Sequence, residues 1–372
     1  MNNNIYLDYA ATTPTDEVAF EAALPYYRNI FFNPSSTHAL GQKAAGAVER
    51  SREKCAAAIN ADPREIYFTS GGTEAINWAM RNMPEGKRHA VVSSIEHDSV
   101  IECAAMLAER GIEVDFVKPD KRGTVTPDAL KKAMRNDTGL VCVMLVNNIV
   151  GSIQPVKALA SVAHESGALF FTDAVQAINA VDVDVKDYGA DMLAVSGHKF
   201  YAPKGVGFLY VDKRIEISPL FYGGEQERGR RAGTVDVPAT VAMGAAIELA
   251  CKRSVDNNAH AEEIRSEFLK NLEFGKPVAC DHAIDDIVSV VFDGINGGRL
   301  AVALSCAGVC CSVGSACSAG SATPPRTLTE MGVANADCSV RFSFGKTTSV
   351  DEVKAAAHII NDTVKRLYSV NR

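Results

Sequence analysis

The strongest constraint on the fold of this chain is a repeated alternation between short apolar stretches and segments with helical periodicity. The stretches rich in β-branched and apolar residues are expected to form strands at residues 89–94, 140–148, 168–174, 192–197 and 205–211. Segments 100–111 and 156–167 have helical spacing, and each ends in the glycine that often follows a helix. This order predicts an α/β fold with a mostly parallel sheet and helices on both faces.

The order of elements changes near residue 240. Beyond it, the helices and strands that we expect lie at residues 238–254, 285–294, 309–314 and 350–370. This change, together with a length of 372 residues, favours two domains. We predict a large domain over residues 14–250 and a smaller α+β domain formed by residues 1–13 and 251–372.

The composition of the chain limits the kinds of molecule that it is expected to bind. The formal net charge is -7 and no block of like charges stands out, which argues against direct binding of nucleic acid or an anionic membrane. The start "MNNNIYLDYAATTP" has no basic stretch followed by an apolar one, and no run of about 18 apolar residues occurs, so we expect a cytoplasmic protein. Ten cysteines without regular spacing favour reduced thiols, and a reactive cysteine is therefore permitted.

Three polar motifs follow expected strands. The stretch "SGHKFYAPKGVG" (196–207) contains Lys199, "FFTDAVQA" contains Asp173 and Gln176, and "TSGGTEAIN" (69–77) places a glycine-rich turn before a helix. Taken alone, Lys199 is more simply a surface lysine, and the glycine turn is weak evidence. Together they suit pyridoxal phosphate, which needs a lysine for a Schiff base, a carboxylate for its ring nitrogen and a helix N-terminus for its phosphate.

The motifs resemble those of the cysteine desulfurases, within the class V aminotransferase branch of the fold-type I pyridoxal phosphate enzymes. The resemblance covers nearly the whole chain and rests on "YLDYAATTP", "NPSSTHALGQKA", "SSIEHDSV", "DAVQ", "SGHKFYAPKG", "ERGRRAGT", "GSACSAGS" and "VRFSFGKTT". It implies a fold-type I transferase dependent on pyridoxal phosphate, with a large domain built on a mostly parallel sheet and a smaller α+β domain.

The resemblance also implies roles for individual residues that contact the cofactor. Lys199 matches the Schiff-base lysine, Asp173 the partner of the ring nitrogen, and Gln176 the partner of the ring hydroxyl. His97 matches the histidine that stacks on the ring and transfers protons. The residues that match phosphate contacts are Gly72, Thr73, Ser196, His198 and Thr234. In this family the residue at Thr234 comes from the partner subunit, which implies a homodimer with shared sites.

For the substrate, the resemblance assigns Arg341 to the carboxylate of L-cysteine, with Asn148 as a neighbouring polar contact. Cys317 matches the nucleophile that takes the substrate sulfur as a persulfide and leaves L-alanine. Its surroundings contain only small residues, so we expect a mobile loop. Strand alternation instead sends Cys310 and Cys311 to opposite faces, where we expect both thiols to be packed and inert.

Several alternatives stay open at this point. Selenocysteine lyase activity is chemically close, and another pyridoxal phosphate aminotransferase or lyase would keep Lys199 and Asp173 without needing Cys317. A metal-binding module would use Cys306, Cys310, Cys311 and Cys317, yet this spacing lacks the paired knuckles of common zinc sites, so we expect no metal site. The sulfur acceptor also stays open between iron-sulfur cluster assembly, tRNA thiolation and another protein carrier.

The sequence departs from the family pattern at two points. Relatives commonly carry a glutamate after the paired asparagines, whereas this chain has Ile149 in "NNIVGSIQP". The stretch "YGGEQERG" is also one glycine shorter than in many relatives. The substitution at Ile149 leaves the subtype and the substrate preference open.

Overall fold

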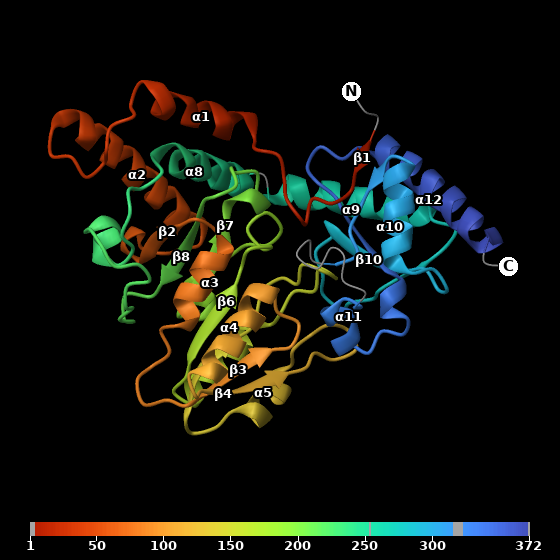
Figure 1. Ribbon diagram of the computed structural model, residues 1–372, viewed down its shortest axis with the longest axis horizontal. Coiled ribbons are helices and arrows are strands. Elements are labelled where there is room, and N and C mark those ends of the chain that lie inside the picture. The colour runs from red at the N-terminus through yellow and green to blue at the C-terminus, as the bar shows by residue number, and fades with distance from the viewer. Residues whose placement is uncertain (1–3, 253, 315–322, 371–372) are drawn as a thin grey trace.

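The computed structural model describes residues 4–252, 254–314 and 323–370, and its larger part is built on a seven-stranded sheet (Figure 1). The strand order is β2-β8-β7-β6-β5-β3-β4. The strands are β2 (Ile66–Thr69), β3 (His89–Ser93), β4 (Glu113–Val117), β5 (Thr138–Cys142), β6 (Leu169–Asp173), β7 (Met192–Ser196) and β8 (Gly207–Val211). Only β8 runs antiparallel to its neighbours in this sheet, so the predicted α/β fold with a mostly parallel sheet is confirmed.

Helices cover both faces of this sheet because successive strand residues point to opposite sides. Val92 packs on the face covered by α3 (Gly72–Met80) and α4 (Asp98–Glu109), whereas its neighbour Val91 packs on the opposite face. That second face is covered by α2 (Ala39–Ala58), α6 (Val156–Glu165) and α8 (Val237–Lys252). The remaining helices of this part are α1 (Glu17–Arg28), which packs on α8, α5 (Pro127–Ala133) and α7 (Val185–Tyr188).

The smaller part is centred on an antiparallel sheet with the order β12-β10-β9. Its elements are β9 (Lys276–Pro277), β10 (Ile287–Val291), β12 (Ser339–Ser343), α9 (Ser254–Asn271), α10 (Gly297–Cys306), α11 (Arg326–Glu330) and α12 (Val350–Val370). Near the N-terminus, β1 (Ile5–Tyr6) pairs in parallel with β11 (Val309–Cys310), and Leu7 joins the same core as α12. The domain boundaries at residues 13 and 250 stay a prediction.

Two expected strands are much shorter than predicted. The stretch 309–314 was expected to be strand, but β11 ends at Cys310, so Cys311 lies just beyond the strand in which it was predicted to alternate with Cys310. The stretch 140–148 was expected to be strand throughout, but β5 ends at Cys142. Beyond it, the Met144 backbone N–H donates to the Glu96 carboxyl group, while the Leu145 N–H still donates to the Asp173 carbonyl. The Met144 N–H therefore donates to a side chain, where a strand residue would donate to the backbone of a neighbouring strand. Among the described residues, no helix is long and apolar enough to cross a membrane.

Candidate active site

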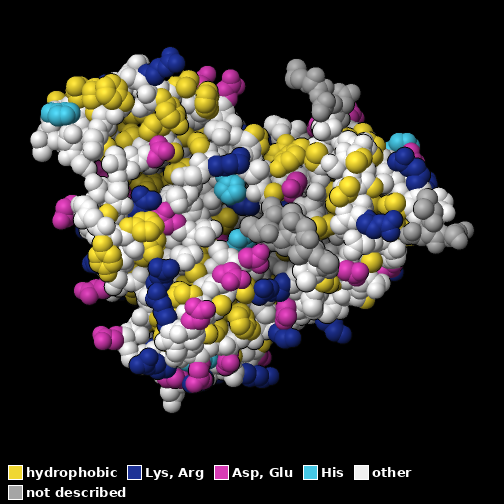
Figure 2. Space-filling view, in the orientation of Figure 1, with side chains coloured by type: hydrophobic (Ala, Val, Ile, Leu, Met, Phe, Trp, Pro, Cys, Tyr) yellow, Lys and Arg dark blue, Asp and Glu magenta, His cyan; other side chains and the backbone are white. Residues whose placement is uncertain are grey.

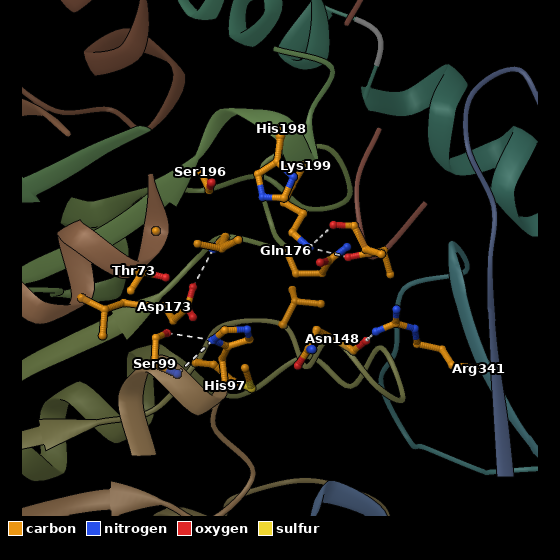
Figure 3. A pocket seen from close by; sticks show the side chains of 17 residues that line it. Thr73, His97, Ser99, Asn148, Asp173, Gln176, Ser196, His198, Lys199 and Arg341 are labelled. Atoms are coloured by element: carbon orange, nitrogen blue, oxygen red, sulfur yellow. Dashed lines mark hydrogen bonds between the residues drawn. The ribbon is translucent and has the colours of Figure 1, made fainter. Parts of the chain in front are cut away.

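A cavity of about 230 Å³ lies where the carboxyl ends of β6 and β7 face β12 (Figure 3). Ligands of open α/β sheets bind at this edge because the loops after the strands converge there. The sequence-predicted residues that line it are Gly72, Thr73, His97, Asn148, Asp173, Gln176, Ser196, His198, Lys199 and Arg341. The tertiary structure thus brings together residues from both parts of the chain.

Lys199 enters the cavity from the short turn that follows β7. Gly197 permits this turn, since a Cβ atom there would lie 2.9 Å from the Ala202 Cβ and 3.1 Å from the Val206 carbonyl oxygen. The Lys199 Nζ donates to the backbone carbonyls of Ala10 and Ala11. These two carbonyls belong to the "YLDYAATTP" motif, and sequence reasoning had assigned them no role.

Asp173 is the last residue of β6 and is buried at the cavity wall. Its carboxylate accepts the Val175 N–H at 2.8 Å, and no ion pair joins it to another described residue. Burial raises the pKa of the Asp173 carboxyl, while His97 and Lys199 oppose that shift. A buried carboxyl with one donor is suited to a cationic ring nitrogen. Nearby, the Gln176 Oε1 is buried without a partner among the described residues, as a ring hydroxyl would require.

The first turn of α3 provides backbone donors for an anion. Gly71 precedes it with φ 148°, and no side chain caps the helix. A Cβ at Gly72 would lie 2.8 Å from the Val175 Cγ2, so this close packing favours glycine. Ser196 and His198 line the same cavity. Uncapped N–H groups at the start of a nine-residue helix favour a phosphate group, and the residues therefore fit pyridoxal phosphate.

His198 is uncharged at neutral pH in this environment. Its ring Nδ1 lies 3.1 Å from the Thr12 Oγ1. Burial, followed by the charges of Lys199 and Lys204, lowers the pKa of His198 to about 4. A neutral imidazole can still donate one hydrogen bond to a phosphate oxygen.

His97 is positioned by its place at the start of α4. It is the N-cap residue, and its Nδ1 accepts the Ser99 N–H at 3.1 Å and lies 2.7 Å from the Ser99 Oγ (Figure 3). Because Nδ1 accepts a backbone N–H, the proton of the neutral ring resides on Nε2. Ser99 was missed by sequence reasoning, although its spacing after His97 in "EHDSV" is the signal of a cap.

Arg341 reaches the cavity from β12 and is 2% exposed. Its Nη1 donates to the Asn148 carbonyl at 2.8 Å, and its Nη2 donates to the Asp8 carboxylate at 2.9 Å. Its buried Nε has no partner among the described residues. The guanidinium is therefore oriented by the protein, and two of its five N–H groups are used in these bonds. Asp8 was not predicted, and its only signal was its place in "YLDYAATTP".

One predicted residue lies elsewhere, and another is not among the described residues. Thr234 is exposed and does not line this cavity. It lines a second cavity of about 190 Å³, together with Phe31 and Phe32. Cys317 lies outside the described residues. Among the described cysteines, burial raises the pKa of Cys311 to about 12, and Cys310 is partly buried in β11.

The other sequence expectations concern a metal site and residue 149. Within residues 4–252, 254–314 and 323–370, no group of His, Cys, Asp or Glu side chains is arranged to hold a metal ion. Ile149 is 6% exposed and packs in an apolar cluster with Val150, Leu328 and Met331.

Comparison with known proteins agrees with this geometry. The family described as aminotransferase class-V matches residues 5–356. The chain belongs to the aminotransferase class-V family. Within this family, it is 40% identical to "Cysteine desulfurase IscS" of Methanosarcina thermophila, over 100% of this chain and 94% of that protein.

Two solved structures extend the comparison to three dimensions. A structure described as "NIFS-LIKE PROTEIN" superposes with a TM-score of 0.92 at 33% identity and covers 98% of this chain and 100% of its own. A second, "SspA in complex with cysteine", has a TM-score of 0.81 at 35% identity and covers 91% and 98%. The aminotransferase class-V fold is therefore shared along nearly the whole chain.

Proposed function

We propose that the chain is a pyridoxal phosphate-dependent cysteine desulfurase that removes sulfur from L-cysteine and releases L-alanine. The observation that carries this proposal is one cavity that brings together the Lys199 amine, the buried Asp173 carboxyl and the Arg341 guanidinium. These are the groups that a reaction of an amino acid on pyridoxal phosphate requires. The names of a relative and of a structural neighbour in complex with cysteine point to the same substrate.

Pyridoxal phosphate supplies, when bound, a ring that takes up the electron pair left at the substrate Cα. The chain offers a partner for each polar group of this cofactor. Asp173 would hold the ring nitrogen and Gln176 the ring hydroxyl. The first turn of α3, with Ser196 and His198, would hold the phosphate.

Three side chains act on the substrate in this proposal. Arg341 binds the carboxylate, because it is fixed in place by Asp8, lines the cavity and keeps N–H donors that these bonds do not use. Lys199 in its neutral form takes the proton from Cα and later returns it to carbon. His97, whose Nδ1 is held by Ser99, uses its Nε2 to exchange the proton of the substrate thiol.

Cys317 is the nucleophile in this proposal, and that role rests on the sequence alone. Its thiolate attacks the substrate sulfur, so that a sulfur–sulfur bond forms while the bond from sulfur to Cβ breaks. The electron pair of the broken bond stays with the carbon, which is protonated to give alanine. The persulfide then passes to a protein acceptor, and we propose iron-sulfur cluster assembly or tRNA thiolation in the cytoplasm as its use.

We also propose that the chain is a homodimer with shared sites. Apolar side chains are exposed along α1 and the segment after it, and hydrophobic atoms gather over this region in Figure 2. They include Val18 (51% exposed), Leu24 (46%), Tyr27 (60%) and Phe31 (69%). Phe31 lines the same cavity as Thr234, the residue that the resemblance assigns to the partner's site. Such a patch is typical of a protein interface.

The reaction is tested by its products. Purified protein with pyridoxal phosphate, L-cysteine and a thiol reductant should release alanine and sulfide in equal amounts. Parallel reactions with L-selenocysteine, and with alanine plus a 2-oxo acid, measure the lyase and aminotransferase alternatives. Transamination without sulfide release would overturn the proposal, and much faster turnover of selenocysteine would reassign the substrate.

A further inference from the structure

Glu96 is a buried carboxyl group that the proposed reaction does not use. It lies between β3 and α4, beside His97, and is 5% exposed. Its Oε1 accepts the Met144 N–H at 2.7 Å, whereas its Oε2 is buried without a hydrogen-bond partner among the described residues. An ionised carboxylate in such a place needs several donors or a cation. The structure gives Glu96 one backbone donor, and the Ser93 hydroxyl adds a second, weaker effect that lowers its pKa.

The charged group that acts most on Glu96 is a second buried acid. Asp173 is also 5% exposed, and its charge adds to burial in raising the pKa of Glu96 well above its ordinary value. No ion pair joins Glu96 to a cation among the described residues. The other titratable groups around it are the thiol of Cys142 and the side chains of His97, Asp98 and Arg326, which line the same side cavity.

Burial and the charge of Asp173 both disfavour ionisation of Glu96. His97 and Lys199 favour the ionised form of Asp173, and the Val175 N–H bonds to it. Glu96 has neither of these charges in its favour. The proton of the pair therefore resides on Glu96.

The side cavity next to Glu96 has a mixed lining. It has a volume of about 300 Å³, and Ile149, Pro324 and Pro325 form apolar parts of its wall. These apolar parts favour the neutral form of an acid, whereas Arg326 on the same wall favours the ionised form. Ile149 stands where the family resemblance leads us to expect a glutamate, so this chain avoids another carboxyl group beside Glu96.

We propose that Glu96 is a positioning residue that stays a neutral carboxylic acid in the enzyme. Its Oε1 fixes the Met144 backbone at the wall of the cofactor cavity, and its neutrality leaves the negative charge of the pair on Asp173. This inference rests on the proposed function only in that pyridoxal phosphate occupies the cavity. The assignment of the proton itself needs no substrate.

Infrared spectroscopy of the holoenzyme without cysteine tests the proton directly. A band of a protonated carboxyl group should be present at pH 8 and absent in Glu96→Gln. The matched control is Glu102→Gln, since Glu102 is exposed on α4 and its loss should leave the band unchanged. The proposal would be overturned if the wild-type spectrum had no such band, or if the band remained in Glu96→Gln.

The cofactor absorption provides a second readout that does not depend on turnover. Glu96→Gln should leave the pH titration of this absorption within about 0.2 units of the wild type, because a neutral amide replaces a neutral acid. Glu96→Ala should weaken cofactor binding about tenfold, since the Met144 N–H loses its acceptor. A downward shift of more than about 0.5 units in Glu96→Gln would show that a negative charge had been removed, and would overturn the proposal. If Glu96→Gln does not fold, persistence of the wild-type band to pH 9 decides the same point, and its loss by pH 8 contradicts the inference.

Discussion

The two walls of the cavity differ in how completely their polar groups are paired. On the wall formed by the seven-stranded sheet, Asp173 accepts one backbone N–H, the Gln176 Oε1 has no partner among the described residues, and no side chain caps α3. On the wall formed by β12, Arg341 is bonded to Asp8 and to the Asn148 carbonyl, and only its Nε lacks a partner among the described residues. The sheet wall thus requires a further molecule to complete its hydrogen bonds, whereas Arg341 is oriented by the protein itself.

Lys199→Ala should have the largest effect, because it removes the covalent attachment that the sheet wall provides. We expect the visible absorption of the bound cofactor to disappear and turnover to fall by at least about a thousandfold. Absorption spectra and alanine release measure both effects. A variant that stays coloured and active would show that the sheet wall is not the cofactor wall.

Cys317→Ser should stop sulfur removal while leaving the functions of both cavity walls, cofactor binding and substrate binding, intact. The variant should bind the cofactor and show a spectral change with cysteine, yet release alanine at less than about a hundredth of the wild-type rate. Cys310→Ala and Cys311→Ala are the matched controls and should keep most of the activity, at a cost of about 1 kcal/mol in unfolding free energy. Mass spectrometry after one turnover should find the extra sulfur on Cys317. Extra sulfur on Cys310 or Cys311 would show that Cys317 is not the nucleophile.

Arg341→Lys should damage the β12 wall alone. Lysine keeps the positive charge but loses the fork of donors, so kcat/KM for cysteine should fall about a hundredfold, mainly through KM. The cofactor absorption should remain. Asp8→Asn, which frees Arg341 from its ion pair, should give a smaller rise in KM. Loss of the cofactor in Arg341→Lys would contradict the separation of the two walls.

Thr234→Ala tests whether the sheet wall is completed by a second copy of the chain. Cofactor affinity should fall about tenfold if this hydroxyl contacts the phosphate. At a cofactor concentration that does not saturate Thr234→Ala, mixing it with Lys199→Ala subunits should yield hybrid dimers that contain one site with both native residues, and activity should rise above that of Thr234→Ala alone. Sedimentation of an active monomer, or absence of complementation between stable dimers, would count against shared sites.

His198 should produce the smallest effect, on stability of the cofactor-free protein at acid pH. Unfolded histidine takes up a proton near pH 6.5, whereas burial lowers the pKa of folded His198 to about 4. Between these values the unfolded state binds more protons, so stability falls as pH decreases. His198→Gln should reduce the loss of the urea midpoint between pH 7 and pH 5, while His358→Gln, at an exposed position on α12, should not. An unchanged pH dependence in His198→Gln would mean that this histidine titrates normally.

The sheet wall was largely predictable because its residues follow local patterns. Apolar strands that end in polar residues drew attention to Asp173 and Lys199, and a glycine turn before a helix suggested a phosphate site, whereas the family resemblance assigned Gly72. The end of β5 was predicted wrongly, since the Met144 N–H bonds to Glu96 and not to a strand. Sequence periodicity cannot predict a hydrogen bond between a strand end and a side chain 48 residues away.

The sequence by itself determined the α/β class and the chemical types gathered for the reaction, because strand alternation, glycine turns and polar strand ends act over a few residues. The tertiary structure alone decided the pairing of Arg341 with Asp8, which is 333 residues away, and the contact of the Lys199 amine with the Ala10 and Ala11 carbonyls. It also placed Glu96 in the field of Asp173. These interactions depend on burial and on distances between remote segments, which only the packed chain fixes.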